Sequence, residues 1–157
     1  LSPQRQSLIQ PVWLTDEQFM QQWLSQPYKR LGFSENDTTQ FYTDKGERVR
    51  SKSEIMIANS LDKAGLPYKI EVPYYLNGYG WVSPDFTILL VRRRIIKIWE
   101  HHGLMDNCDY VNKNFLGKNN AYIANGYYPG INLIQTFETQ QHPLSTKIIN
   151  EIILDNN

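Results

Sequence analysis

Apolar residues recur at two different spacings along the chain, and each change of spacing marks a new element. Apolar positions three and four residues apart predict amphipathic helices, whereas short runs rich in β-branched and aromatic residues predict strands. In chain order, the predicted elements are a helix over 51–64, strands over 68–76, 83–91 and 95–102, a helix over 106–125, a strand over 131–137 and a helix over 145–154. This order predicts a mixed α/β domain.

The first third of the chain is less regular. We expect it to form an N-terminal helical and irregular extension over residues 1–47, followed by the α/β domain over residues 48–157. The segment Thr15–Gln18 has the Thr-x-x-Gln form of a capping box, which predicts a short helix that ends near Pro27. The residues beyond it lack a clear period, apart from a short strand predicted at Phe41–Thr43.

Turn residues separate the predicted strands. Pro73 lies inside the strand over 68–76, so we expect that strand to be bulged or to lie at a sheet edge. Asn77–Gly80 predicts the hairpin turn to the next strand, and Arg92–Arg94 predicts the solvated tip of the hairpin that follows. The three strands should therefore form consecutive antiparallel pairs.

Two carboxylates interrupt the apolar strands. Asp85 stands near the start of the strand over 83–91, and Glu100 stands near the end of the strand over 95–102. These positions adjoin in an antiparallel hairpin, and a lone charge on an apolar strand is costly to bury, so we expect a cation between the two acids. Oxygen ligands of this kind favour a hard cation such as Mg²⁺ or Mn²⁺.

Glu54 is a third candidate carboxylate. It leads the apolar stripe of the helix over 51–64, so it could point at the same place and bind the ion or orient a second one. Ser51 and Glu54 also have the spacing of a capping box, which gives Glu54 a purely structural alternative.

The acids occur in a spacing that resembles one nuclease superfamily. Pro84-Asp85 is followed after fifteen residues by Glu100, and a helix with Glu54 lies upstream. With the element order, this resembles the PD-(D/E)XK nuclease superfamily over about residues 50–154. The resemblance implies a restriction-endonuclease-like mixed sheet core, made of a helix, three antiparallel strands, a helix, a strand and a helix. It also implies metal-dependent cleavage of phosphodiester bonds, mostly in DNA, with Asp85, Glu100, Glu54 and the backbone carbonyl of His101 as candidate metal ligands.

The sequence departs from that pattern at one position, because the lysine expected two residues after the second acid is His102. Strand parity places His102 on the same face as Glu100 and the side chain of His101 on the opposite face. Three alternatives follow: His102 positions the attacking water, Lys118 supplies an amine from the next helix, or the domain is inactive and binds nucleic acid or a protein partner without cutting. We favour an arrangement in which Lys118 lies near the site and His102 contacts the site directly. The candidate catalytic residues are Glu54, Asp85, Glu100, His102 and Lys118.

Charge narrows the surfaces that could bind nucleic acid. Sixteen Lys and Arg residues balance sixteen Asp and Glu residues, so any basic surface must be local. Arg48, Arg50 and Lys52 alternate and would share one side of an extended chain, which makes them candidate contacts to a nucleic-acid backbone. DNA is favoured over RNA on the resemblance alone.

Other features of the sequence bear on the cellular compartment of the protein and on its class of function. No apolar run approaches the roughly 20 residues of a membrane span, so we expect no membrane partner. The single cysteine, Cys108, excludes an internal disulfide and fits a reducing cytoplasm. The first residue is not Met, which leaves further domains open, and a homodimer is also open. No Gly-x-Ser-x-Gly elbow supports a small-molecule hydrolase. The acid pair and the resemblance together predict a metal-dependent endo- or exonuclease.

Overall fold

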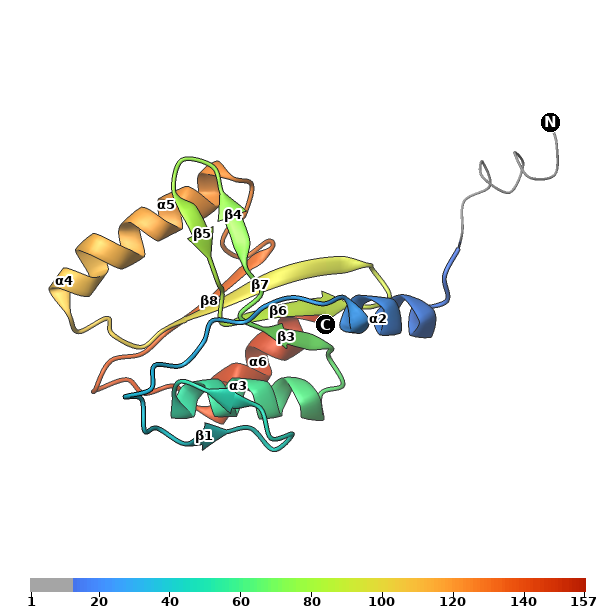
Figure 1. Ribbon diagram of the computed structural model, residues 1–157, viewed down its shortest axis with the longest axis horizontal. Helices are drawn as coiled ribbons and strands as arrows, with labels where there is room; N and C mark the ends of the chain where they lie inside the picture. The colour runs from blue at the N-terminus through green and yellow to red at the C-terminus, as the bar shows by residue number, and fades with distance from the viewer. Residues whose placement is uncertain (1–12) are drawn as a thin grey trace.

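A four-stranded sheet forms the centre of the protein, as a computed structural model describes it for residues 13–157 (Figure 1). The strands follow the order β3-β6-β7-β8, in which β6 runs antiparallel to both β3 and β7, and β8 runs parallel to β7. Two small hairpins, β1–β2 and β4–β5, lie outside this sheet. The elements are α2 (Asp16–Ser25), β1 (Phe41–Tyr42), β2 (Arg48–Val49), α3 (Lys52–Lys63), β3 (Tyr68–Ile70), β4 (Tyr74–Leu76), β5 (Gly80–Val82), β6 (Phe86–Leu90), β7 (Ile95–His102), α4 (Cys108–Tyr110), the π-helical η1 (Val111–Phe115), α5 (Leu116–Ala124), β8 (Leu133–Phe137) and α6 (Thr146–Asn156).

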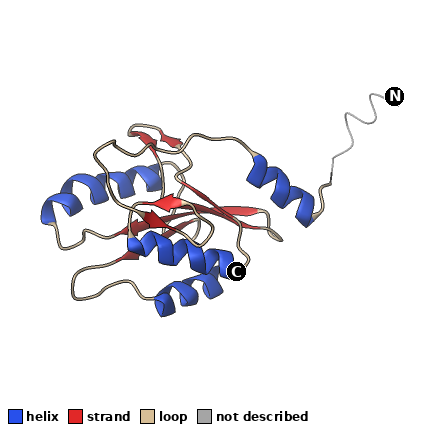
Figure 2. Ribbon diagram, turned by 60° about the horizontal axis from the view of Figure 1, so that its bottom comes forward, coloured by secondary structure: helices blue, strands red, loops and turns tan. Residues whose placement is uncertain are grey.

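Helices cover both faces of the sheet (Figures 1 and 2). Apolar residues of α3 and α6 pack on one face together with Trp99 of β7. The helix composed of α4, η1 and α5 covers the other face, where Tyr122 packs with Ile98 and Leu133. Because neighbouring residues of a strand point to opposite faces, Ile98 and Trp99 belong to these two separate clusters.

The predicted α/β class is confirmed, and so are most of the predicted elements. Ser51 caps α3 by accepting a hydrogen bond from the Glu54 N–H at 3.2 Å, and Thr15 begins α2 with a capping box. Arg92–Arg94 form the turn between β6 and β7. No helix within residues 13–157 is long and apolar enough to cross a membrane.

The predicted continuous strand over 68–76 is wrong, because the chain divides it into β3 and β4. Glu71 adopts a left-handed backbone conformation with a φ of 57° directly after β3, and Pro73, which has no N–H to donate, precedes β4. The turn at Asn77–Gly80 therefore joins β4 to β5 instead of joining two strands of the main sheet. β3 pairs directly with β6, and the β4–β5 hairpin is an insertion between them.

The predicted helix over 106–125 contains a feature that its apolar pattern did not predict. It begins at Cys108 after the N-cap residue Asn107, and its segment Val111–Phe115 is π-helical. The Leu116 N–H bonds to the Val111 carbonyl, which is the i→i+5 pattern of a π-turn. This turn changes which residues the helix presents to the sheet.

The described part of the predicted N-terminal extension packs against the α/β domain. β1 and β2 form an antiparallel hairpin across the predicted boundary between residues 47 and 48. Trp23 of α2 is buried, and Lys69 Nζ of the edge strand β3 lies 4.3 Å from its ring centroid. Arg30 contacts Glu71 at 2.9 Å. Residues on the extension's side of that boundary thus contact β3 and the bend that follows it.

Candidate active site

Asp85 and Glu100 lie side by side, just before β6 and near the end of β7. Phe86 opposes Trp99 in this antiparallel pair, so one further step along both strands brings Asp85 opposite Glu100. Asp85 Oδ2 accepts a hydrogen bond from the backbone N–H of His101 at 2.7 Å. The register of the hairpin therefore brings together the two acids, as the sequence predicts.

Glu100 is buried and Asp85 is half-buried, and this burial affects the charge of Asp85. Glu100 is only 4% exposed. Burial raises the pKa of Asp85 well above its ordinary value, and the nearby charges of Glu100 and Glu54 raise that pKa further, while the Lys118 ammonium opposes them. Asp85 should therefore take up a proton or bind a cation more readily than an exposed aspartate does.

Two side chains of α5 hold Glu100. Lys118 Nζ lies 3.0 Å from Glu100 Oε1, and the Tyr122 hydroxyl donates a hydrogen bond to the same oxygen at 2.7 Å. Burial alone would lower the pKa of Lys118, but the Glu100 carboxylate outweighs it and raises that pKa above its ordinary value. Lys118 is therefore a charged amine at neutral pH, placed where the sequence analysis expects it.

The π-helical turn explains how this helix brings four side chains to one face of β7. In a regular α-helix, with about 100° per residue, positions eight apart such as 110 and 118 differ by about 80° around the axis. A π-turn accommodates one extra residue, so Tyr110, Phe115, Lys118 and Tyr122 take the places of i, i+4, i+7 and i+11 in one stripe. The first two contact His102, and the last two contact Glu100.

His102 occupies the position where the resembled motif has lysine, but it is a packed side chain. Its ring stacks on Phe137 with 5.0 Å between centroids, meets Phe115 edge to face at 4.7 Å, and is 3% exposed. Its Nδ1 lies 3.3 Å from the Tyr110 hydroxyl, and its buried Nε2 makes no hydrogen bond to the described residues. Burial, followed by the charge of Lys118, lowers the pKa of His102 to about 4, so the ring is neutral at neutral pH.

Glu54 has the capping role that its sequence position suggests, and one of its carboxylate oxygens is left over. Its Oε2 accepts a hydrogen bond from the Ser51 hydroxyl at 2.8 Å, which belongs to the N-terminus of α3. Its Oε1 is buried and makes no hydrogen bond to the described residues. Burial raises the pKa of Glu54, and the carboxylate lies near enough to Asp85 to raise the pKa of Asp85 as well. Glu54 is thus close enough to Asp85 for their charges to interact, with one oxygen still available.

The side chain of His101 faces away from Glu100, as strand parity predicts. Its Nε2 lies 2.7 Å from Glu138 Oε1, and its Nδ1 lies 2.8 Å from Thr136 Oγ1. Ser53 at the start of α3 donates a hydrogen bond to the same Glu138 oxygen at 2.5 Å. Glu138 belongs to no motif in the sequence, although its place directly after a buried strand parallel to β7 is a signal for it.

Arg48 and Arg50, two of the predicted nucleic-acid contacts, share one side of the chain but contact the protein itself. Their guanidinium groups lie 4.0 Å and 4.2 Å from the centroid of the Phe33 ring. Arg50 also pairs with both oxygens of the buried Glu71, at 3.2 Å and 3.0 Å. Lys52 is exposed at the start of α3. Binding of nucleic acid by these residues stays a prediction.

The donor atoms at the site are compatible with Mg²⁺ or Mn²⁺. Within residues 13–157, no group of three or more His, Cys, Asp or Glu side chains is arranged to hold a metal ion. Asp85 and Glu100 nonetheless supply two carboxylates, and Mg²⁺ typically binds one or two carboxylates and keeps several waters. The N–H and C=O of a strand residue point the same way, so the His101 carbonyl lies on the side of Asp85. The free Glu54 oxygen adds negative charge that a cation would offset.

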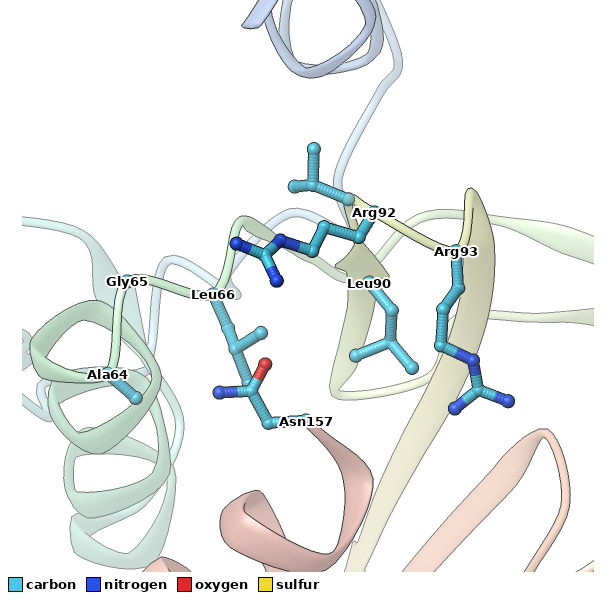
Figure 3. Close-up of a pocket in the computed structure, with 8 residues that line it drawn as sticks. Ala64, Gly65, Leu66, Leu90, Arg92, Arg93 and Asn157 are labelled. Carbon is cyan, nitrogen blue, oxygen red and sulfur yellow. The ribbon is translucent and has the colours of Figure 1, made fainter. Parts of the chain in front are cut away.

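Two pockets differ in their position relative to the acid pair. One of about 410 Å³ opens beside the N-terminus of α3 and the end of β7, and it is lined by Arg50, Ser51, Glu54, His101, Gly103, Leu104, Tyr110 and Glu138. A larger one of about 530 Å³ lies near the β6–β7 turn, at the opposite end of these strands (Figure 3). Figure 3 shows Arg92 and Arg93 pointing in different directions from that turn. The larger pocket is therefore separate from the acid pair.

Comparison with known proteins gives one similar protein. No family model matches the chain, and no solved structure matches it. The chain is 33% identical over 91 residues to the uncharacterized protein MJ1519 of Methanocaldococcus jannaschii. The match covers 58% of this chain and 8% of the length of that relative. The function proposed below therefore rests on the side chains of the site.

Proposed function

We propose that the protein is a metal-dependent nuclease of the PD-(D/E)XK type, which hydrolyses phosphodiester bonds and prefers DNA. The observation that carries this proposal is the 3.0 Å contact of Lys118 with Glu100, next to Asp85. Two acids and an amine are the side chains that the resemblance calls for, although the amine comes from α5 instead of β7. The order of elements from α3 to α6 supports a restriction-endonuclease-like core.

In this proposal the two acids hold the ion, and the residues of α5 arrange the reacting groups. Asp85 and Glu100, with the His101 carbonyl, would hold Mg²⁺ or Mn²⁺, and Glu54 would bind through a water. The bound ion would polarise the phosphoryl group and lower the pKa of a water. Lys118, which stays protonated, would donate hydrogen bonds to the negative charge that develops on the phosphoryl oxygens.

The Tyr122 hydroxyl and the His101 N–H have supporting roles in the same site. The Tyr122 hydroxyl holds the Glu100 carboxylate in one orientation, and the His101 N–H does the same for Asp85. Such fixed donors reduce the reorganisation that a reaction requires. His102, neutral and enclosed by aromatic rings, would support Phe115 and the helix that carries Lys118.

A second function, binding of nucleic acid or a protein partner without cleavage, is favoured by two observations. The residue two positions after Glu100 is a buried histidine, and the described residues contain no larger metal-binding group. A domain that had lost catalysis could keep the same fold.

A cleavage assay separates the two functions. Single-stranded and duplex DNA and RNA are incubated with the full chain in Mg²⁺ or Mn²⁺, and products are resolved by length. We expect metal-dependent cleavage that is lost in the Asp85→Ala/Glu100→Ala variant. Lys118→Met should reduce the rate by about 100-fold, because one stabilising donor is removed. Lys147→Met, at an exposed lysine of α6, is the matched control. Full activity in the double variant would refute the proposal.

A further inference from the structure

The β4–β5 hairpin carries an aromatic surface that faces solvent. Tyr75 and Trp81 oppose each other across the two strands, and their rings meet edge to face with 5.4 Å between centroids. Trp81 is 71% exposed, Tyr75 is 59% exposed, and Tyr79 in the turn is 48% exposed. Large exposed aromatic side chains gathered on one small element typically indicate a binding surface.

The hairpin is attached firmly to the helix that bears Lys118. On its inner side, Leu76 and Val82 are buried in the same cluster as Tyr122 of α5. At its turn, the Asn77 N–H donates to Asn125 Oδ1 at 2.8 Å, and Asn125 Nδ2 donates to the Asn77 carbonyl at 3.2 Å. Figure 1 shows β4 and β5 beside α5. The aromatic surface is therefore presented on a fixed support.

The same hairpin is directly connected to the candidate active site. β5 ends at Val82, and the chain reaches Asp85 three residues later. Tyr122 packs against the inner side of the hairpin while its hydroxyl bonds to Glu100. A ligand on the outer side of the hairpin would thus lie on an element adjoining the acid pair.

The charge distribution around the hairpin indicates what kind of partner it fits. Residues 72–84, which contain the hairpin, carry no charged side chain at all. Residues 110–137, which contain η1, α5 and β8, carry Lys113 and Lys118 but no Asp or Glu. The chain as a whole has sixteen acidic residues, so the hairpin and the helix beside it contribute less repulsion toward a polyanion than other segments of the chain do.

We propose that the β4–β5 hairpin binds unpaired bases of a single-stranded nucleic acid, which stack on Trp81 and Tyr75. Aromatic side chains on which bases stack, together with positive charge along the backbone, are the features that bind single strands irrespective of sequence, and the hairpin supplies the first of them. Paired bases in a duplex present no free face to these rings, so the substrate is a single strand or a duplex with an unpaired stretch. This inference rests on the proposed nuclease function and names the substrate class of the same site.

Binding measured without cleavage tests this assignment. Fluorescence anisotropy of an end-labelled oligothymidylate is recorded with the full chain in EDTA, so that the metal-dependent reaction is absent. Tyr75→Ala/Trp81→Ala should weaken binding by about tenfold or more. Trp81→Phe should keep most of the affinity. Tyr42→Ala, at a 50% exposed tyrosine of β1, is the matched control and should bind as the wild type does.

An abasic strand of the same length separates stacking from charge. It keeps the phosphates but has no bases, so wild type and Tyr75→Ala/Trp81→Ala should bind it equally weakly. Equal affinity of both proteins for oligothymidylate would overturn the proposal. So would a wild-type dimer in sedimentation that the double variant dissociates, because the surface would then bind a second copy of the chain. Retained binding without any cleavage would refute the nuclease function and leave this inference standing.

Discussion

Replacement of Asp85 by Asn should make the metal-free protein more stable at about pH 8. The Asn side chain keeps an oxygen that can accept the His101 N–H, but it removes the charge next to Glu100. Burial and the neighbouring acids raise the pKa of Asp85 in the folded protein, so ionised Asp85 disfavours the folded state. One pKa unit corresponds to about 1.4 kcal/mol, and we expect a gain of about 1–3 kcal/mol in the free energy of unfolding.

This gain should depend on pH. Below the ordinary Asp pKa of about 3.9, Asp85 is protonated in both the folded and the unfolded protein, and the variant should match the wild type. As the pH rises above that value, the unfolded chain loses this proton first, and the wild type loses stability until the folded-state pKa is passed. The difference between the two proteins should therefore grow with pH and then level off.

Urea denaturation followed by tryptophan fluorescence measures this difference at about pH 4, 6 and 8. Asp44→Asn, at an exposed aspartate of the β1–β2 hairpin, controls for the loss of one negative charge. Excess Mn²⁺ should stabilise the wild type and have less effect on Asp85→Asn, because only the wild type keeps both acids. A variant less stable than the wild type at about pH 8, or a difference that does not change with pH, would show that Asp85 carries no uncompensated charge.

Three further predictions concern the residues around the acid pair. His102→Ala should lower the free energy of unfolding, measured by urea titration, by about 2–4 kcal/mol, because it leaves a cavity in its aromatic pocket. The pH dependence of cleavage, measured as a pH–rate profile, should not change. Deletion of the exposed Asn112 should turn the π-turn into plain α-helix and keep Lys118 beside Glu100, so the cleavage assay should still show activity. Insertion of one alanine at the same place should rotate the Lys118 amine by about 100° and abolish cleavage. Glu71→Gln should cost about 2–3 kcal/mol in urea titrations, because two arginines lose their buried partner.

Strand parity and hairpin register were enough to predict the arrangement of the acids. The alternation of side chains along a strand has a period of two, so Glu100 and His101 had to point to opposite faces. Once the Arg92–Arg94 turn was placed, the antiparallel register brought Asp85 within one residue of Glu100, and the observed turn over 91–94 sets the two opposite each other. These inferences depend on local geometry, which tertiary contacts rarely override.

The features that escaped prediction depend on contacts between distant segments. Glu71 is held with a positive φ beside Arg30 and Arg50, and neither partner is near it in the sequence. Its bend releases the β4–β5 hairpin from the sheet, which an apolar pattern over 68–76 does not indicate. The π-turn likewise leaves the spacing of apolar residues almost unchanged.

His102 and Lys118 depart from the resembled motif together, and the structure gives one physical reason for both. The place two residues after Glu100 is enclosed by Phe115 and Phe137, where a charged amine would exchange its hydration for two aromatic rings and the Tyr110 hydroxyl. A neutral histidine fits there. The amine then has to reach Glu100 from another element, and the extra residue of the π-turn rotates α5 so that Lys118 does so. The aromatic pocket and the π-turn are therefore two parts of one arrangement, and one further residue inserted between them should move the amine away from the acids.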